Sequence, residues 1–472
     1  MHRTLQPKPL HGLGLTMRQS RPNYTNIKPK LHHSQAQTTN HTRPPTPAKG
    51  DQSLSDKARI GGENIVRQQL ISYLCSMDIT PNTRAFIANH AEDNVQELAL
   101  KAHGTDDIDL PFALTQIEGR QIAARKLPAM AANPDIVWPE RVALEQCSGE
   151  QTAAIKADIV RQLLPEEHRT SLLDVTGGFG IDFLCLAPLF QKATYLELNP
   201  ALRDTVSHNL KALSIAANTV CGDGVEYLKR LKEPASLLYI DPSRRGDSGQ
   251  RVYAITDCKP NVRALLSDIL AKSRMALIKL SPMLDIHSTV SELHMAKHVY
   301  IVGNGNECKE LLVAVSKAAE ENPMVTCIDG PWTFEARLNS GKKPVYAETI
   351  EPGMFLYEPG PAVMKTGLFG DLCAQTGTQM VGINSHLFVS HRQATAFPGR
   401  EFTLLAAIPA HRKPLKATIG RAGQANISVR NFPASAETVK KRFGIKDGGD
   451  HYVFATTLAK GVHRMLVCKK TR

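Results

Sequence analysis

The sequence lacks the features that mark membrane proteins, disulfide-bonded secreted proteins and zinc ribbons. No apolar run approaches the ~20 residues that a membrane-spanning helix needs. The nine cysteines are scattered along the chain, and no two of them form a C-x-x-C pair. The N-terminal residues contain no apolar core of the kind found in secretory signals. We therefore expect a reduced, cytoplasmic protein with no metal site and no membrane contact.

Acidic residues are absent from the first fifty positions, which contain eight Lys or Arg. This segment therefore carries +8 of the net charge of +12, and the rest of the chain is only mildly basic. The segment is rich in Pro, His, Thr and Gln and shows no sustained apolar period. Such a composition cannot bury a core, so we expect residues 1–57 to form a disordered basic tail.

The chain has 472 residues, which is enough for two or three domains. Residues 58–149 predict a mainly helical region, in which Phe86, Ile87, Val95 and Leu98 form one apolar stripe. An amphipathic helix is expected to begin at about residue 150 and to end before Pro165. Its apolar side consists of Ile155, Ile159, Val160, Leu163 and Leu164.

From residue 170 onward, short apolar runs alternate with helical patterns. Repeated β-α units predict a parallel sheet with helices on both faces, so residues 150–330 should form a doubly wound α/β domain. Two final strand-like runs, joined by the Gly/Asn loop in VYIVGNGNECKELLVAV, predict an antiparallel pair that closes one edge of the sheet. The expected strands are Leu172–Val175, Thr194–Leu198, Thr219–Cys221, Leu237–Ile240, Met275–Leu280 and Val299–Val302.

Four carboxylates stand at the ends of four successive expected strands: Asp174, Glu197, Asp223 and Asp241. The first precedes a glycine-rich turn that contains Gly177, Gly178 and Gly180. In such sheets ligands bind outside the carboxyl ends of the strands. Acids there disfavour a pyrophosphate, which prefers amides and positive charge, and suit a ligand with an ammonium group, ribose hydroxyls and an amino-purine.

Each of these residues alone has a simpler explanation. Glycine also serves close packing of helix and strand, and single acids often cap helices. The glycines also lack the third-glycine spacing that is typical of nicotinamide cofactor sites. The interpretation as a ligand site therefore depends on the order of the four acids and the glycines and on their position at the strand ends.

With the glycine-rich turn and the four acids at successive strand ends, residues 150–320 resemble the Rossmann-like class I S-adenosylmethionine methyltransferases. The resemblance implies that S-adenosylmethionine is the cofactor and that Asp174 and the Gly177–Gly180 turn hold its methionine end. Glu197 would accept hydrogen bonds from the ribose hydroxyls, and Asp223 would lie beside the adenine amino group.

The fourth strand leads into DPSRR, where many nucleic-acid amino-methyltransferases carry Asn/Asp-Pro-Pro and an aromatic residue. The resemblance implies that Asp241 orients the acceptor group. Ser243 and Arg244 replace the second proline and the aromatic residue, which puts methylation of an exocyclic amine in doubt, although Arg244 can itself stack on a base. No cysteine occupies the motif, so covalent attack on a pyrimidine ring is disfavoured.

Basic residues near this motif are candidate substrate contacts. Arg244, Arg245 and Arg251 either hold substrate phosphates or pair with nearby aspartates. Lys279, near the end of the fifth strand, either contacts the substrate or extends its ammonium group to solvent.

Beyond residue 330 the pattern changes, and PWTFEARLNSGKKPVYAE predicts a linker or an added sheet edge. The stretches ANISVRNFP and IKDGGDHYVFATT resemble the THUMP-like domain that follows a methyltransferase domain in one group of bacterial proteins. The resemblance implies two small α+β domains, a ferredoxin-like module at 354–400 and a THUMP-like RNA-binding domain at 401–472. Together with LEQCSGEQTAAIK at Leu144–Lys156, it covers most of residues 78–472.

THUMP domains bind structured RNA, often tRNA. The THUMP-like segment at 401–472 contains five basic residues that can contact RNA phosphates. Any protein surface of this size can carry as much positive charge, so these residues alone do not indicate RNA binding. They are Arg412, Lys413, Lys416, Arg421 and Arg430. We therefore predict a cytosolic methyltransferase that acts on a nucleotide in structured RNA (tRNA or rRNA) by in-line transfer. The alternatives are a methyltransferase of proteins or small molecules and a non-catalytic nucleotide- or RNA-binding protein.

Overall fold

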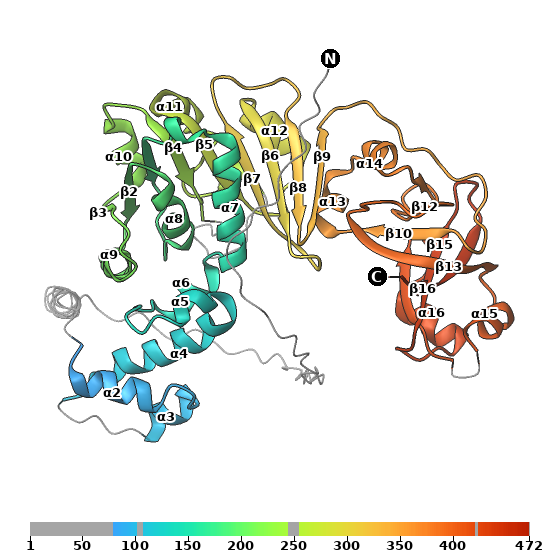
Figure 1. Ribbon diagram of the computed structural model, residues 1–472, viewed down its shortest axis with the longest axis horizontal. Coiled ribbons are helices and arrows are strands. Elements are labelled where there is room, and N and C mark those ends of the chain that lie inside the picture. The colour runs from blue at the N-terminus through green and yellow to red at the C-terminus, as the bar shows by residue number, and fades with distance from the viewer. Residues whose placement is uncertain (1–78, 102–106, 244–253, 421–422, 472) are drawn as a thin grey trace, which may run out of the picture. The chain divides into compact units, whose positions relative to one another are not determined.

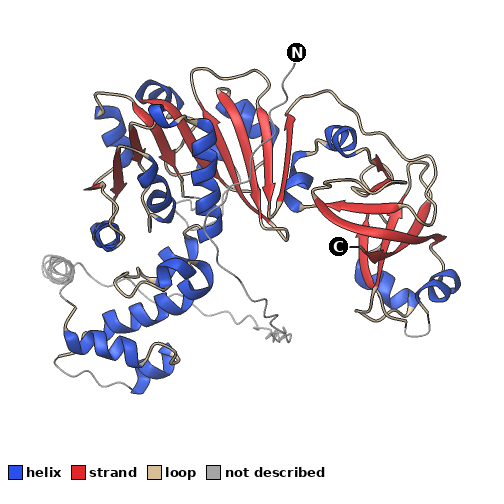
Figure 2. Ribbon diagram, in the orientation of Figure 1, coloured by secondary structure: helices blue, strands red, loops and turns tan. Residues whose placement is uncertain are grey.

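The computed structural model describes residues 79–101, 107–243, 254–420 and 423–471, which form helices and two sheets (Figures 1 and 2). No helix in these ranges is long and apolar enough to cross a membrane. The same residues contain no cluster of His, Cys, Asp and Glu suited to a metal ion.

The larger sheet has nine strands in the order β3-β2-β1-β4-β5-β7-β6-β8-β9. The first five strands of the chain pair in parallel, which brings their C-terminal ends to one edge of the sheet. The expected strands are confirmed, apart from their end residues. The strands are β1 (Ser171–Asp174), β2 (Lys192–Glu197), β3 (Asn218–Cys221), β4 (Ala235–Ile240), β5 (Ser273–Leu280), β6 (Ala296–Gly303), β7 (Cys308–Val315), β8 (Met324–Asp329) and β9 (Trp332–Arg337).

Helices cover both faces of this sheet, so the predicted doubly wound α/β fold is confirmed (Figure 1). Successive strand residues, such as Leu172 and Leu173, point into two different apolar clusters. One cluster includes α7 (Glu150–Leu163), α8 (Ile181–Leu186) and α9 (Pro200–Ala212), and the other includes α10 (Gly224–Arg230), α11 (Leu266–Lys272) and α12 (Ile286–Leu293).

The predicted antiparallel pair is formed by β6 and β7, but it does not close the sheet. β7 lies between β5 and β6, and β8 adds in parallel on the outer side of β6. β9, within the stretch predicted as a linker or an added edge, pairs with β8 and forms the edge. The prediction of the edge was wrong because residues 324–329 were not recognised as a further strand, β8, which pairs with β6 rather than with β7, the strand before it in the chain.

The described residues before the sheet are mainly helical. The predicted single stripe of this region is wrong, because the chain leaves the helix after Asn89 and starts a new one at Val95. The Asn94 side chain caps the new helix by accepting hydrogen bonds from the backbone N–H groups of Gln96 and Glu97. The helices are α2 (Pro81–Asn89), α3 (Val95–Lys101), α4 (Leu110–Lys126), α5 (Pro128–Ala131) and α6 (Arg141–Gln146).

The smaller sheet has seven strands in the order β11-β12-β10-β13-β16-β15-β14. β10 pairs with β12 on one side and with β13 on the other, so the two C-terminal segments distinguished by sequence share one sheet. Its elements are β10 (Phe355–Pro359), α13 (Pro361–Thr366), α14 (Phe369–Thr376), β11 (Gln379–Met380), β12 (Phe388–Ser390), β13 (Gly399–Pro409), α15 (Arg412–Ile419), β14 (Asn426–Arg430), α16 (Ala436–Phe443), β15 (His451–Thr457) and β16 (His463–Lys470).

The buried carboxylate of Asp329, at the end of β8, joins this part of the chain to the larger sheet. It accepts hydrogen bonds from the backbone N–H groups of Gly305 and, at 3.2 Å, of Ala362 in α13. Lys365, also in α13, donates to the Leu284 carbonyl at 2.6 Å. The backbone N–H groups of Gly305 and Ala362 and the carbonyl of Leu284 are thus hydrogen-bonded where the larger sheet contacts α13.

Candidate active site

Asp174, at the end of β1, holds the glycine-rich turn in place. Its Oδ1 accepts hydrogen bonds from the backbone N–H of Thr176 at 2.9 Å, from the Thr176 hydroxyl at 3.1 Å and from the backbone N–H of Gly177 at 3.1 Å. The residue is only 2% exposed. Burial raises the pKa of Asp174 to about 7, and the hydrogen bonds from Thr176 and Gly177 oppose that rise.

The turn then passes very close to the second strand end. A Cβ at Gly177 would lie 2.3 Å from the Leu196 carbonyl oxygen and 2.8 Å from Glu197 Oε2, and the backbone there has φ +43°. Only glycine fits this position. The Glu197 carboxylate accepts hydrogen bonds from the N–H of Gly178 at 2.7 Å and from the N–H of Asn199 at 2.8 Å. Glu197 therefore links the turn after β1 to the end of β2.

The third acid, Asp223, is exposed and caps α10. Its Oδ1 accepts hydrogen bonds from the N–H groups of Val225 at 2.7 Å and Glu226 at 3.1 Å. The next residue, Gly224, is pressed against the end of β1, because a Cβ there would lie 2.0 Å from the Val175 carbonyl oxygen. The structure therefore brings the ends of β1, β2 and β3 together, as the parallel pairing requires.

Asp241 follows β4 beside the same turn. Its backbone N–H donates to the Thr176 hydroxyl at 2.8 Å, and its side chain is 42% exposed. Lys279, from the end of β5, donates to Asp241 Oδ2 at 2.6 Å. The two arginines predicted to follow, Arg244 and Arg245, lie outside the described residues.

Lys279 does not extend to solvent, so that alternative is wrong. Its side chain is 13% exposed and also donates to the Ser148 hydroxyl at 3.1 Å. Burial lowers the pKa of Lys279, but the carboxylates of Asp241, Asp182 and Glu310 outweigh that effect and raise it above its usual value. Lys279 is therefore a charged group fixed beside Asp241.

A buried polar cluster lies behind this pair. Lys156, fully buried in α7, has its Nζ 3.1 Å from Asp182 Oδ1 and forms a second ion pair with Glu310 of β7. The Ser148 hydroxyl and the Tyr239 hydroxyl both donate to Asp182 Oδ2, at 2.8 and 2.6 Å. Burial would raise the pKa of Asp182, but Lys156, Lys279 and these hydrogen bonds lower it.

The sequence interpretation missed this cluster. Lys156 lies at helical spacing from Ala153, Ile159 and Val160, which are all buried, so the periodicity itself places a lysine on the apolar face of α7. That lysine was a usable signal, because a buried lysine requires an anionic partner. Glu310 gives no comparable signal, since 154 residues separate it from Lys156.

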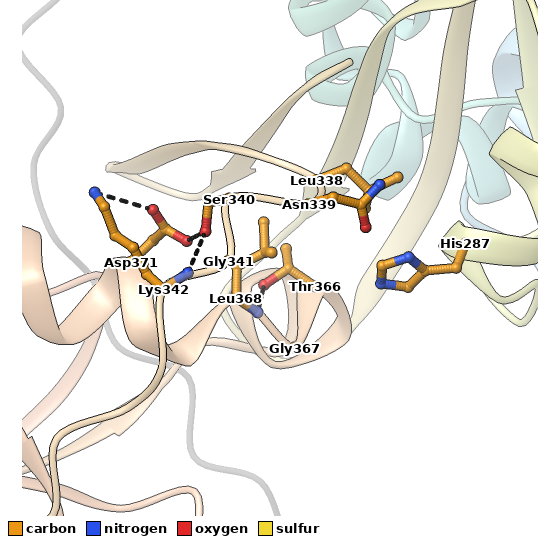
Figure 3. Close-up of a pocket in the computed structure, with 10 residues that line it drawn as sticks. All are labelled: His287, Leu338, Asn339, Ser340, Gly341, Lys342, Thr366, Gly367, Leu368 and Asp371. Atoms are coloured by element: carbon orange, nitrogen blue, oxygen red, sulfur yellow. Dashed lines mark hydrogen bonds and ion pairs between the residues drawn. The ribbon is translucent and has the colours of Figure 1, made fainter. Parts of the chain in front are cut away.

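The cavity in Figure 3, of about 370 Å³, lies away from the strand-end acids. His287 of α12, residues 338–342, residues 366–368 and Asp371 line it, and none of the four acids does. Ser340 donates to Asp371, and Lys342 Nζ lies 3.3 Å from Asp371 Oδ1. These polar groups are paired with one another, so the chemistry at the strand ends marks the better candidate site.

Comparisons with known proteins agree with this geometry. This chain is 30% identical in sequence to a candidate methyltransferase from Porphyromonas gingivalis W83, whose crystal structure is known. The two structures superpose with a TM-score of 0.74 over 83% of this chain and 98% of that one. Residues 355–398 match the ferredoxin-like domain family, and residues 399–470 match the THUMP domain-like family. The chain belongs to the class I S-adenosylmethionine-dependent methyltransferases.

A further relative of this methyltransferase is an RNA methyltransferase from Parasynechococcus marenigrum, itself described as uncharacterised. The two are 32% identical over 132 residues, which is 27% of this chain. The matched segment spans 28% of the length of that curated relative.

The residues at the strand ends of the methyltransferase fit its cofactor, S-adenosylmethionine. Glu197 is partly exposed, Asp223 is exposed, and carboxylate oxygens are suitable acceptors for ribose hydroxyl and adenine amino donors. The absence of a side chain at Gly177 lets the turn approach closely to the strand carrying Glu197. When bound, the cofactor supplies an electrophilic methyl group on a sulfonium ion.

The C-terminal sheet of the methyltransferase carries a basic face formed by α15 and α16. Arg412, Lys413 and Lys416 of α15 are exposed, whereas Leu415 and Ile419 are buried in the same apolar cluster as Val439 and Phe443 of α16. The last turn of α16 adds the exposed Lys441 and Arg442 and the half-buried Lys440, whose ammonium group pairs with Asp447 at 2.6 Å. The sequence interpretation singled out none of these three. We call these six residues the α15–α16 basic face.

One other basic residue predicted to meet phosphates, Arg430, does not join this face. The Arg430 guanidinium donates to the buried carboxylate of Glu358 at 2.5 Å, and Arg400 donates to the same carboxylate at 2.8 Å. Arg430 therefore compensates a buried charge within the sheet. Arg421 lies outside the described residues.

Proposed function

We propose that the protein transfers the methyl group of S-adenosylmethionine to a nucleotide in structured RNA, tRNA or rRNA. The proposal rests on one combination of features. Asp241 is half-exposed beside the glycine-rich turn after β1, and the THUMP-like domain carries the α15–α16 basic face. The first provides an acceptor site, and the second provides contacts for phosphates.

In this proposal Asp174 and the Gly177–Gly180 turn hold the methionine end of the cofactor. Glu197 accepts hydrogen bonds from the ribose hydroxyls, and Asp223 accepts one from the adenine amino group. Asp241 orients the acceptor for in-line attack on the methyl carbon. Because such transfer needs mainly proximity and alignment, no covalent enzyme intermediate is required.

The substrate contacts divide between the two sheets. Lys279 acts at the acceptor site through its ion pair with Asp241. Arg412 and Lys413, at the start of α15, contact phosphates of the RNA. RNA binding is supported by the THUMP-like match and by the RNA methyltransferase relative.

The test is methyl transfer from isotopically labelled S-adenosylmethionine to total RNA and to total protein from a strain that lacks the gene. We expect label in RNA with the wild-type protein. The Asp241→Ala variant should lose turnover and keep near-normal cofactor affinity, because its interaction matters mainly in the transition state. Label in protein alone, or full activity of the variant, would contradict the proposal.

A further inference from the structure

The acceptor site contains a fixed cation as well as a carboxylate. Lys279 Nζ lies 2.6 Å from Asp241 Oδ2 and is held from behind by Ser148 at 3.1 Å. Asp182 and Glu310 oxygens lie 3.5 and 3.9 Å from the same nitrogen. An ammonium group with this many partners cannot swing away when substrate binds, so its charge acts on the reacting group.

The charges behind the site balance one another. Two lysines, the fully buried Lys156 and the mostly buried Lys279, face two buried carboxylates, Asp182 and Glu310. This set of four is neutral when all its members are ionised. Asp241 is then an additional anion at the exposed end of the set, and the ammonium group of Lys279 lies directly beside it. A methyl acceptor bound at Asp241 therefore lies beside both a carboxylate and an ammonium group.

This pair distinguishes between the two common kinds of methyl acceptor. An amine gains positive charge as it attacks the sulfonium methyl group, and a fixed ammonium ion nearby opposes that change. A hydroxyl group loses its proton and gains negative charge on oxygen, which an ammonium ion stabilises and a carboxylate assists by accepting the proton. The described part of the motif, Asp241–Ser243, also offers no aromatic side chain on which a base could stack.

We propose that the methyl acceptor is a ribose hydroxyl group of the RNA, with Lys279 stabilising the developing oxyanion. This inference rests on the function proposed above and specifies its substrate class. In the step, the hydroxyl oxygen forms a bond to the methyl carbon as the carbon–sulfur bond breaks. Its electrons remain on sulfur, which leaves as the neutral thioether of S-adenosylhomocysteine. The hydroxyl proton passes to the Asp241 carboxylate and then to water.

The product of the reaction tests the inference directly. The full-length protein is incubated with labelled S-adenosylmethionine and total RNA from a strain that lacks the gene, and the RNA is then hydrolysed with alkali. Alkaline cleavage needs a free ribose 2′-hydroxyl, so methylation of that oxygen leaves labelled, alkali-resistant dinucleotides. Label in mononucleotides would show base methylation and would overturn the inference while leaving the proposed RNA methylation intact. Label in protein alone would remove both.

Variants of Lys279 test its role separately. We expect Lys279→Met to lower turnover at least ~100-fold with little change in cofactor affinity, because an electrostatic contact to the transition state is lost. Lys279→Arg keeps the charge and should restore turnover to within ~10-fold of wild type. Arg274→Met, an exposed position at the other end of β5, is the control and should be fully active. Full turnover by folded Lys279→Met would overturn the assignment.

Discussion

A single carboxylate, Glu197, connects two parts of the cofactor site. It accepts hydrogen bonds from Gly178 in the turn after β1 and from Asn199 beyond β2. A carboxylate has about four acceptor positions, so it can also accept hydrogen bonds from a ligand. Its position, more than its acidity, therefore suits it to bind the cofactor ribose.

The Glu197→Ala variant should weaken S-adenosylmethionine binding at least ~10-fold, because it leaves ligand hydroxyls without their acceptor. Calorimetry on the folded variant measures this. Glu226→Ala is the matched control, since Glu226 is a carboxylate of α10 that pairs at the surface with Lys229 and Arg230. Equal affinity of both variants for the cofactor would remove Glu197 from the site.

The buried Asp174 should make stability depend on pH. Its folded-state pKa of about 7 is above the usual ~4 of an unfolded aspartate, so the folded protein binds this proton more tightly. The resulting stability is fully present below pH ~4 and is lost as the pH rises through 7, at about 1.4 kcal/mol per pKa unit. Denaturant unfolding of wild type and Asp174→Asn between pH 4 and 7 measures the difference. An equally steep decline in both proteins would contradict the assignment.

At the scale of elements, the glycine turn and the neighbouring strand ends determine one another's shape. The turn passes so close to β2 that Gly177 has no room for a side chain, whereas nothing lies within 4 Å of a Cβ at Gly178. Both residues have positive φ. The two positions therefore separate the effect of close approach from the effect of backbone conformation.

Gly177→Ala should lower the free energy of unfolding by about 2–5 kcal/mol, because strain from positive φ adds to a clash with backbone. Gly178→Ala should lower it by only about 1–2 kcal/mol, from strain alone. Thermal unfolding of the two variants, with calorimetry of cofactor binding, compares them. A Gly178→Ala variant as unstable as Gly177→Ala would show that the close approach is unimportant.

Local sequence patterns were sufficient for the parallel strands and for the order of the strand-end acids, because each depends on residues adjacent in the chain. They were insufficient for the sheet edge, since β8 pairs with β6 and not with β7, the strand before it in the chain. They also missed the cluster around Asp182, because the partners of Asp182 come from three elements (α7, β4 and β5) and from the loop before α7. Pairings of this kind depend on the tertiary fold, which no local spacing records.

At the scale of the whole molecule, the acids of the cofactor site lie on the larger sheet and the α15–α16 basic face lies on the smaller one. β10 pairs along its whole length with residues 399–403 of β13, so a truncation between the two C-terminal segments would break a sheet. Surface substitutions are therefore the sharper way to separate cofactor binding from RNA binding.

Replacing Arg412, Lys413 and Lys416 together with alanine should weaken binding of total tRNA at least ~10-fold at low salt. It should also reduce the slope of log affinity against log salt by up to about 3, because phosphate contacts are lost. Cofactor affinity should not change. The control is Lys469→Ala with Lys470→Ala, exposed on β16. A second control is deletion of residues 1–57, whose charge can bind RNA nonspecifically. Unchanged binding by the triple variant would exclude this face.

The most direct test of RNA methylation by this protein is mass spectrometry of the modified nucleosides in total RNA from a deletion strain and its parent. We expect one methylated nucleoside to be missing or depleted in the deletion strain. The wild-type gene should restore it, and the Asp241→Ala gene should not, although the variant protein accumulates and binds S-adenosylmethionine. Identical modification profiles in the deletion strain and its parent would contradict the proposal that RNA is the substrate.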